Sequence, residues 1–197
     1  MAKIKICGLK RKEDISFVNE LKPDYIGFIL SNGYKRSIDM EILRNLRDRL
    51  SKDIKTVGVF VDEDIAIVNM LIKMNLIDIV QLHGSETVRY IKQIDAPVIK
   101  MLKPEDFDKI SEFEPYVDYF LFDSGTGSGK TFDWGMIVKT QKPFFLAGGL
   151  DENNLEKAIK EINPYCVDLS SAVETDSVKD YDKMKTIIDI VRSIDNE

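Results

Sequence analysis

The sequence contains few of the residues on which several common kinds of site depend. Its 197 residues include two cysteines, Cys7 and Cys166, one tryptophan and one histidine, His83. Two cysteines make no disulfide framework, so we expect a reducing compartment, the cytoplasm. A single histidine gives little support to a histidine-based metal centre or to a Ser-His-Asp triad. We therefore expect no metal site.

The sequence also lacks long apolar runs and an excess of basic residues. No run approaches the ~18 residues that a membrane span needs. Met1-Ala2-Lys3 leads directly into a strand pattern, so we expect no signal peptide. Lys and Arg number 28 against 34 Asp and Glu, which gives a net charge of −6. A nucleic-acid-binding module needs a basic stripe, so neither a nucleic acid nor a membrane is an expected partner.

What the sequence has in quantity is short apolar runs, each ending in a polar or glycine-bearing turn and followed by a helix pattern. Strands separated by helices pair side by side as a parallel sheet that is buried on both faces. Such units predict an α/β protein whose sheet closes into a (β/α)8 (TIM) barrel. We expect one domain over residues 1–197, with short loops, because roughly 200 residues is the usual floor for this fold. The runs cover residues 3–7, 24–30, 55–61, 77–83, 97–102, 117–123, 143–148 and 165–170.

Helix patterns fill the gaps between the runs. Acidic or hydroxyl residues suited to a helix start occur at Asp39, in the stretch 62–64, at Ser85 and at Asp151. The link between the sixth and seventh runs is the weakest, since residues 134–140 offer only about two helical turns.

The residues with the most distinctive chemistry follow the strands, and in a barrel the carboxyl ends of all strands meet at one rim. Gly148 and Gly149, after the seventh run, allow a close approach of the backbone to an anion, and a helix start nearby supplies N–H donors. Ser171 and Ala172, after the eighth run, are the small residues that such a loop requires. These residues predict a phosphate site; the alternative is that both glycines make a tight turn.

A glycine-rich segment follows the sixth run at residues 122–134. The nucleotide-binding pattern GxxxxGK[ST] requires a glycine where this chain has Ser124, and Gly129-Lys130-Thr131 opens no long helix. We expect residues 124–132 to form a mobile cover over the site, anchored by Phe132 or Trp134.

A carboxyl and a thiol are the candidate acid and base. Asp123 closes a buried run, and a carboxyl with apolar walls can keep its proton near neutral pH; the alternative is a cap for the glycine loop. Cys7 ends the first strand before Gly8, and a thiolate there requires nearby cations or helix ends; the alternative is a core thiol.

Two further side chains of the rim have open roles. His83 either lines the site or fills the rim. Arg36 either lies at the surface or binds a carboxylate or phosphate through its guanidinium.

Five motifs, in order along nearly the whole chain, resemble those of the phosphoribosylanthranilate isomerase family of tryptophan biosynthesis. They are Lys5-Ile6-Cys7-Gly8-Leu9, Gln81-Leu82-His83-Gly84, Gly129-Lys130-Thr131-Phe132-Asp133-Trp134, Leu146-Ala147-Gly148-Gly149-Leu150 and Val167-Asp168-Leu169-Ser170-Ser171.

The resemblance implies a β/α barrel and an Amadori rearrangement of a phosphosugar substrate, N-(5-phosphoribosyl)anthranilate, with no cofactor. It implies that Cys7 is the base and Asp123 the acid, and that Arg36 pairs with the anthranilate carboxylate. It places the phosphate near Gly148, Gly149, Ser171 and Ala172, and His83 in the wall of the site. The family offers both monomers and homodimers as the expected state. Ala172 departs from the usual glycine, and its methyl group restricts the loop if φ is positive there.

Two other functions stay open. Another phosphosugar barrel enzyme, such as an epimerase or a Schiff-base aldolase, is the first; an aldolase requires an inward lysine, for which Lys100 is the candidate. The second is a catalytically silent barrel that serves as a binding partner.

Overall fold

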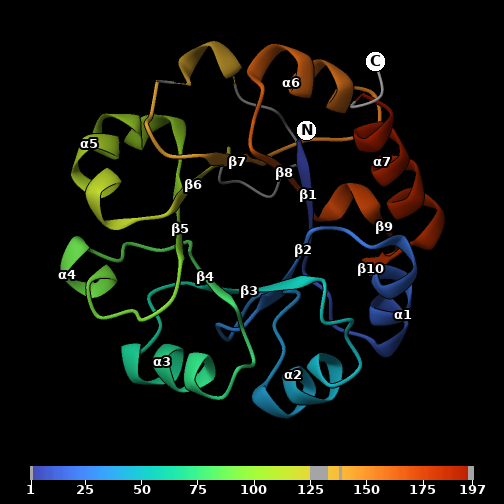
Figure 1. Ribbon diagram of the computed structural model, residues 1–197, viewed down its shortest axis with the longest axis horizontal. Helices are drawn as coiled ribbons and strands as arrows, with labels where there is room; N and C mark the ends of the chain where they lie inside the picture. The colour runs from blue at the N-terminus through green and yellow to red at the C-terminus, as the bar shows by residue number, and fades with distance from the viewer. Residues whose placement is uncertain (1, 125–132, 138, 195–197) are drawn as a thin grey trace.

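The chain closes into the barrel that the apolar runs predict. The computed structural model describes residues 2–124, 133–137 and 139–194. Eight parallel strands pair in chain order, and β1 pairs with β8 to close the ring. Figure 1 shows the strands at the centre and the helices as a ring around them. The strands are β1 (Lys3–Cys7), β2 (Tyr25–Ile29), β3 (Lys55–Phe60), β4 (Ile79–Leu82), β5 (Val98–Leu102), β6 (Tyr119–Phe122), β7 (Phe144–Leu146) and β8 (Cys166–Leu169).

The connections between strands carry helices of very different length. The α-helices are α1 (Lys12–Leu21), α2 (Met40–Arg47), α3 (Ile65–Lys73), α4 (Val88–Ile91), α5 (Ile110–Phe113), α6 (Leu155–Ile162) and α7 (Tyr181–Ile194). Short 3-10 turns are η1 (Pro104–Lys109), η2 (Glu114–Tyr116), η3 (Trp134–Met136) and η4 (Ser171–Val173), and a small hairpin consists of β9 (Glu174–Thr175) and β10 (Val178–Lys179).

Two of the expected helix starts are confirmed. Asp39 is the N-cap of α2, and its carboxylate accepts a hydrogen bond from the N–H of Ile42 at 2.8 Å. Asp64 is the N-cap of α3 and accepts from the N–H of Ala66 at 2.8 Å. Each carboxylate satisfies an amide that has no acceptor within its helix.

The other two expected starts are wrong. Helix α4 is capped by Thr87 rather than Ser85. Helix α6 begins at Leu155, and Asp151 lies in the turn before it, where its carboxylate accepts from the N–H groups of residues 153 and 154. At Asp151 the carboxylate binds the amides of its own turn, whereas the amide of Ser85 donates to the carboxylate of Asp62 from the loop after β3. Sequence pattern does not separate such loops from a helix start.

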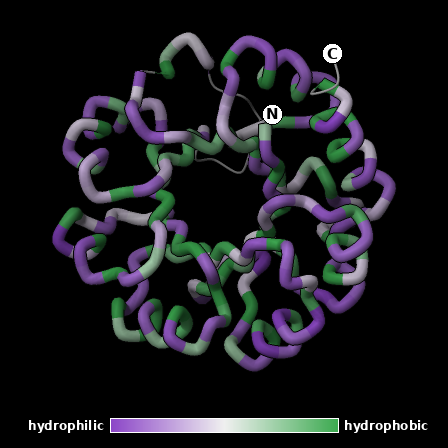
Figure 2. Tube along the Cα trace, viewed as in Figure 1, coloured by the Kyte–Doolittle hydropathy of each residue, from purple (hydrophilic) through white to green (hydrophobic). Residues whose placement is uncertain are grey.

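The barrel has two hydrophobic cores, because alternate residues of each strand face opposite sides of the sheet. The outer core lies between strands and helices and includes Ile4 and Ile6 of β1. Figure 2 shows hydrophobic residues along the strands and hydrophilic residues over much of the outer ring. The inner core fills the barrel and consists of Tyr25, Val57, Ile79, Ile99, Met101, Leu121, Phe145, Ala147 and Cys166.

The same alternation decides which lysine points inward. Ile99 and Met101 of β5 belong to the inner core, so Lys100 between them faces the helices. Its Nζ donates to Glu86 Oε2 at 2.8 Å in a buried ion pair. The expectation that Lys100 is an inward lysine is therefore wrong. Lys5 of β1, which is fully buried between Ile4 and Ile6, points into the barrel instead.

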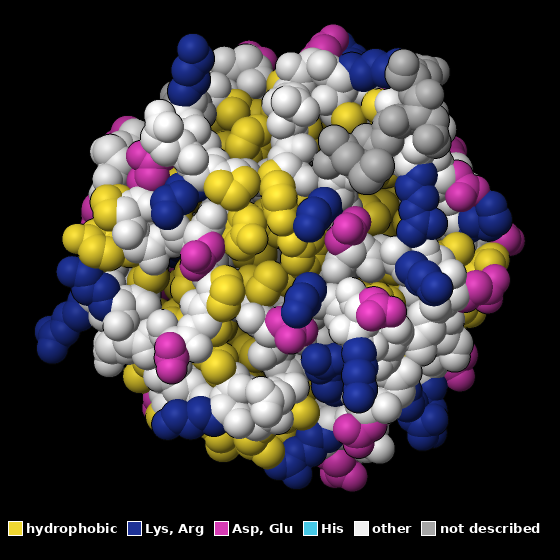
Figure 3. All heavy atoms as spheres, in the orientation of Figure 1, with side chains coloured by type: hydrophobic (Ala, Val, Ile, Leu, Met, Phe, Trp, Pro, Cys, Tyr) yellow, Lys and Arg dark blue, Asp and Glu magenta, His cyan; other side chains and the backbone are white. Residues whose placement is uncertain are grey.

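Aromatic rings close the amino-terminal end of the barrel. The hydroxyl groups of Tyr25 and Tyr165 are 2.8 Å apart, and the ring of Tyr119 packs against Tyr165. The ammonium of Lys3 lies 5.2 Å from the centre of the Tyr165 ring. The view down the barrel in Figure 3 shows hydrophobic side chains gathered at the centre of that face, within a rim of charged ones. A barrel sealed in this way leaves its carboxyl end for a ligand.

The link between β6 and β7 contains less helix than expected. Between residues 133 and 137 the structure has only the turn η3, and Trp134 packs against the outer core. Phe132 and most of the predicted cover, residues 125–132, lie outside the described residues.

The hairpin β9–β10 sits on the barrel rim after β8. Its two turn residues, Asp176 and Ser177, have φ of 50° and 66°. Positive φ at both positions defines the hairpin turn that follows the twist of the strands. The hairpin presents Glu174 and Lys179 toward the end of β1.

Candidate active site

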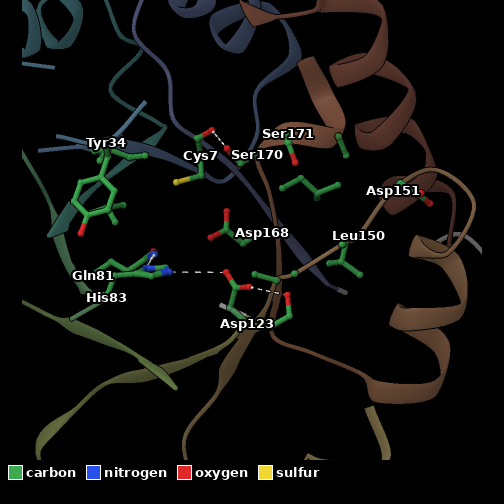
Figure 4. A pocket seen from close by; sticks show the side chains of 18 of the residues that line it. Cys7, Tyr34, Gln81, His83, Asp123, Leu150, Asp151, Asp168, Ser170 and Ser171 are labelled. Atoms are coloured by element: carbon green, nitrogen blue, oxygen red, sulfur yellow. Dashed lines mark hydrogen bonds and ion pairs between the residues drawn. The ribbon is translucent and has the colours of Figure 1, made fainter. Parts of the chain in front are cut away.

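A pocket of about 460 Å³ opens inside the ring at the carboxyl ends of the strands. Pockets for small molecules fall in the range of about 300 to 1,000 Å³. Figure 4 shows side chains from β1, β4, β6 and β8 that converge on it. Of the predicted site residues, all but Arg36 line the pocket: Cys7, His83, Asp123, Gly148, Gly149, Ser171 and Ala172.

Cys7 presents its sulfur to the pocket from the end of β1 (Figure 4). The residue is 8% exposed. The chain turns away at Gly8, whose φ is 81°, and a β-carbon there would lie 2.5 Å from Cδ of Arg36. Only glycine fits this position without displacing the arginine. Burial raises the pKa of the Cys7 thiol, and the neighbouring Lys5 ammonium lowers it in opposition.

Asp123 and His83 lie next to each other in the lining of the pocket. Oδ2 of Asp123 lies 3.8 Å from Nε2 of His83. The amide Nε2 of Gln81 is 3.0 Å from Nδ1 of His83. With the amide donating, Nδ1 accepts and the N–H at Nε2 is directed at the Asp123 carboxyl. Gln81 therefore orients the imidazole toward the candidate acid.

The loop after β7 lies directly against Asp123 because Gly148 has no side chain. Gly148 has φ of 83°, and a β-carbon on it would lie 2.7 Å from the backbone nitrogen of Ser124 and 2.9 Å from Oδ1 of Asp123. Gly149 has φ of 69°, and its carbonyl accepts from the side-chain amide of Asn154 at 2.8 Å. The two glycines thus have the left-handed backbone that suits close approach to a ligand.

The loop after β8 forms the facing wall. Its turn η4 begins at Ser171, and the first amides of a helical turn have no acceptor within the turn. Ala172 lies inside η4 and is not in the left-handed region, so its methyl group strains no backbone. The hydroxyl of Ser170 donates to the carbonyl of Cys7 at 3.0 Å, which ties this loop to β1.

Asp168 lies in the lining of the pocket with the buried Lys5 beneath it, and sequence reasoning selected neither residue. Asp168 lines the pocket between Cys7 and Asp123 (Figure 4). Its Oδ2 accepts from Nζ of Lys5 at 2.7 Å, and burial raises the pKa of its carboxyl. Its Oδ1 is buried and has no hydrogen-bond partner among the residues that the structure describes. An acceptor in that position is available to a ligand hydroxyl.

Arg36 lies beside the pocket rather than in its wall. Its Nε and Nη2 donate to the two carboxylate oxygens of Glu174 at 2.6 and 2.7 Å. Glu174 also accepts from Nζ of Lys179 at 2.7 Å. These cations hold the pKa of Glu174 at about 2, against the effect of its burial. The binding of a substrate carboxylate by Arg36 remains a prediction.

Tyr34 is an aromatic residue of the pocket that sequence reasoning did not select. It lies two residues before Arg36 in the loop after β2 and is 49% exposed. Ser37 braces the loop: its hydroxyl donates to the carbonyl of Ser31 at 2.6 Å and accepts from the N–H of Tyr34 at 3.1 Å. In Figure 4 the ring lies on the side of the pocket opposite Leu150.

Other kinds of site have little support. Within residues 2–124, 133–137 and 139–194, no cluster of three or more His, Cys, Asp or Glu is arranged to hold a metal ion. Over the same residues, none of the helices has the length and apolar character needed to cross a bilayer. Cys7 and Cys166 are both free thiols.

Together these observations define a β/α-barrel protein of the enzyme type, with a carboxyl, a thiol and a glycine-rich loop in one pocket at the rim of the barrel. The model of the family described as "N-(5'phosphoribosyl)anthranilate (PRA) isomerase" matches residues 4–190. An N-(5'-phosphoribosyl)anthranilate isomerase of Endomicrobium trichonymphae is 47% identical over 203 residues, with 98% of this chain and 100% of the relative covered.

Solved structures agree. A dimeric phosphoribosylanthranilate isomerase of Thermotoga maritima, crystallised as engineered monomers, superposes with a TM-score of 0.87 at 31% identity, covering 98% of this chain and 100% of that one. A phosphoribosylanthranilate isomerase in complex with reduced 1-(o-carboxyphenylamino)-1-deoxyribulose 5-phosphate gives 0.85 at 29% identity, covering 98% and 100%. This chain belongs to the N-(5'-phosphoribosyl)anthranilate isomerase family.

Proposed function

We propose that this chain converts N-(5-phosphoribosyl)anthranilate into 1-(o-carboxyphenylamino)-1-deoxyribulose 5-phosphate in tryptophan biosynthesis, with Asp123 as the acid and Cys7 as the base. The observation that carries the proposal is the position of both groups in one pocket, beside a glycine-rich anion loop. Membership of the family supports the reaction.

Asp123 opens the sugar ring. Its carboxyl donates a proton to the furanose oxygen, the bond from that oxygen to C1 breaks, and the nitrogen lone pair forms the imine. Asp123 is left as a carboxylate that faces the N–H of His83. The N–H of His83 donates toward this carboxylate and stabilises it.

Cys7 then acts on C2. The thiolate removes the C2 proton, which the adjacent protonated imine acidifies, and the electron pair moves to form the enol amine. Tautomerisation of this enol gives the aminoketone. The reaction moves protons and electron pairs within one molecule and needs no oxidant. Positioned acids and bases of this kind contribute about 10² to 10⁴ in rate.

The two ends of the substrate occupy different walls. The phosphate lies on backbone N–H groups around Gly148, Gly149, Ser171 and Ala172, where small residues allow close approach. Arg36 faces the anthranilate carboxylate with the guanidinium hydrogens that Glu174 does not use.

The rival functions have less support from the described residues. An aldolase needs a free inward lysine; Lys100 faces the helices in an ion pair, and Lys5 is fully buried against Asp168. A catalytically silent barrel has no use for an acid, a base and an anion loop in the same pocket. The proposal includes a single catalytic domain, a cytoplasmic setting in which Cys7 stays reduced, and a monomer or a homodimer.

Loss of anthranilate-type fluorescence as the substrate is consumed tests the activity. We expect Cys7→Ala and Asp123→Asn each to lower kcat by about 10² or more. Cys166→Ala, which removes the other thiol, serves as the control and keeps its turnover. Near-normal kcat in Cys7→Ala removes Cys7 from the mechanism. Loss of the folded signal in Asp123→Asn assigns that residue to the structure instead.

A further inference from the structure

A buried lysine lies beneath the candidate base, between the pocket and the apolar inner core of the barrel. Lys5 is fully buried and occurs two residues before Cys7 in β1, so both side chains point into the barrel. Below them are the aromatic and aliphatic residues of the inner core. An unpaired ammonium in such a place is strongly disfavoured, so its partners define what it does.

Lys5 has two partners of different kind. Its Nζ donates to Oδ2 of Asp168 at 2.7 Å, from the residue that pairs with it in β8. The thiol of Cys7, two residues further along the same face of β1, is the second group that acts on its charge. Both partners raise the pKa of Lys5 above its ordinary value despite burial, so the ammonium stays charged at neutral pH. An ammonium has three donors, enough to serve both groups at once.

The neighbouring strand leaves room for both side chains. Gly27 of β2 is the register partner of Cys7. A β-carbon on Gly27 would lie 2.6 Å from Sγ of Cys7 and 3.2 Å from Nζ of Lys5. Any other residue would therefore displace the thiol from the ammonium. The glycine in the middle of a strand marks a place where two side chains need its space.

The surroundings of Cys7 act on the pKa of its thiol in two directions. Burial and Asp168 raise this pKa, whereas Lys5 and Lys179 lower it. The pKa of Arg36, in the loop after β2, is raised first by its hydrogen bonds to Glu174 and also by Cys7. Lys179 is committed to Glu174 and to the carbonyl of Ser170. Lys5 is thus the cation that lies beside the sulfur on the same inner face of β1.

We propose that the Lys5 ammonium is the counter-ion of the Cys7 thiolate, shared with Asp168, and that Lys5 is the positioning residue of the base. In the thiol state Lys5 pairs with Asp168; in the thiolate state it neutralises both anions in part. The consequence for turnover rests on the proposed role of Cys7 in the isomerase reaction. The effect of Lys5 on the ionisation of the Cys7 thiol does not depend on that role.

Alkylation of the thiol tests the proposal without using turnover. In a Cys166→Ala background Cys7 is the one thiol of the chain, and its reaction rate with iodoacetamide follows its thiolate fraction. We expect Lys5→Met to raise the pH midpoint of alkylation by about one unit or more, a roughly tenfold loss of rate at neutral pH. Asp168→Asn lowers the midpoint, because an opposing carboxylate is gone and Lys5 pairs with the thiolate alone.

Lys100→Met is the matched control. Lys100 is also a buried strand lysine in an ion pair with a carboxylate, but it faces the helices. Its loss destabilises the barrel in the same way and leaves the alkylation midpoint of Cys7 in place. The pH profile of kcat/KM in Lys5→Met shifts to the alkaline side along with the alkylation midpoint.

The double variant Lys5→Met/Asp168→Asn covers the case in which Lys5→Met alone fails to fold, since a lone buried carboxylate is strongly destabilising. Both charges are then absent, and the midpoint lies above that of Asp168→Asn. Equal midpoints in these two variants, or equal midpoints in Lys5→Met and Lys100→Met, overturn the proposal. Normal turnover in Cys7→Ala refutes the base assignment instead and leaves the alkylation comparison intact.

Discussion

Nε2 of His83 lies 3.8 Å from Oδ2 of Asp123, although β5 separates the strands from which the two residues come. The curvature of the closed ring turns both side chains to the same pocket. Gln81, two residues earlier on the same face of β4, holds the other ring nitrogen of the imidazole, Nδ1. The proposed acid is therefore held by a chain of side chains from the ends of two strands, β4 and β6.

This arrangement predicts the effect of removing the imidazole. His83→Ala takes away the N–H that faces the Asp123 carboxylate, and we expect kcat to fall about tenfold, the value of one hydrogen bond of about 1.4 kcal/mol. KM changes little, because the contact concerns the proton donor. Gln81→Leu leaves the ring in place without its orienting partner and gives a smaller loss. Steady-state kinetics that show a raised KM with normal kcat assign His83 to substrate binding alone.

The ring of Tyr34 predicts a contact with the aromatic half of the substrate. Aromatic pairs contribute about 0.5 to 1.5 kcal/mol beyond the area that they bury, so Tyr34→Ala raises KM by about 2- to 12-fold. Tyr34→Phe keeps the ring and serves as the matched control, with KM near that of the parent. Competitive inhibition by inorganic phosphate is expected to stay the same in both variants, because the loops that we propose to bind phosphate are on the other wall. A weaker inhibition by phosphate in Tyr34→Ala contradicts a contact limited to the ring.

The ion pair of Arg36 with Glu174 predicts that Glu174 acts on substrate binding through the arginine. Glu174→Gln removes the bidentate acceptor that fixes the guanidinium, and we expect KM to rise several-fold while kcat stays within about twofold. Arg36→Ala raises KM further. In the double variant the effects are not additive, since Glu174 has no role in binding without Arg36. Additive effects on KM place the two residues in separate functions.

Much of the fold was predictable because parallel strands that are buried on both faces appear in the sequence as continuous apolar runs. Eight apolar runs at β/α spacing fix the number and order of the strands, and the rule that strand ends meet at one rim selects Cys7, His83 and Asp123 together. The turns were less predictable. Asp151 satisfies the amides of its own turn rather than those of a helix, and both arrangements use the same residue type.

The missed residues are those whose partners are distant in sequence. Lys5 and Asp168 lie inside strands, 163 residues apart. In the sequence each is a single charged residue within an apolar run, and nothing nearby indicates its partner. A local signal was present: Lys3, Lys5 and Cys7 alternate with the isoleucines of the outer core, which assigns all three to the barrel interior. Glu174 carries no such signal, because only the closed ring and the β9–β10 hairpin bring it to Arg36 across 138 residues.

Glu174 also predicts how the protein responds to acid. Arg36 and Lys179 hold the pKa of its carboxyl at about 2 in the folded state, below the unfolded value near about 4.3. Between these two values the unfolded chain binds more protons than the folded one, so the stability that Glu174 contributes is complete above the unfolded pKa and is lost as pH falls toward the folded pKa. Allowing for solvent screening at the rim, this contribution is on the order of 2 kcal/mol. We expect Glu174→Gln to be less stable than the parent in urea at pH above about 5 and to approach it at pH about 2. A difference between the two proteins that stays constant over this pH range contradicts the linkage.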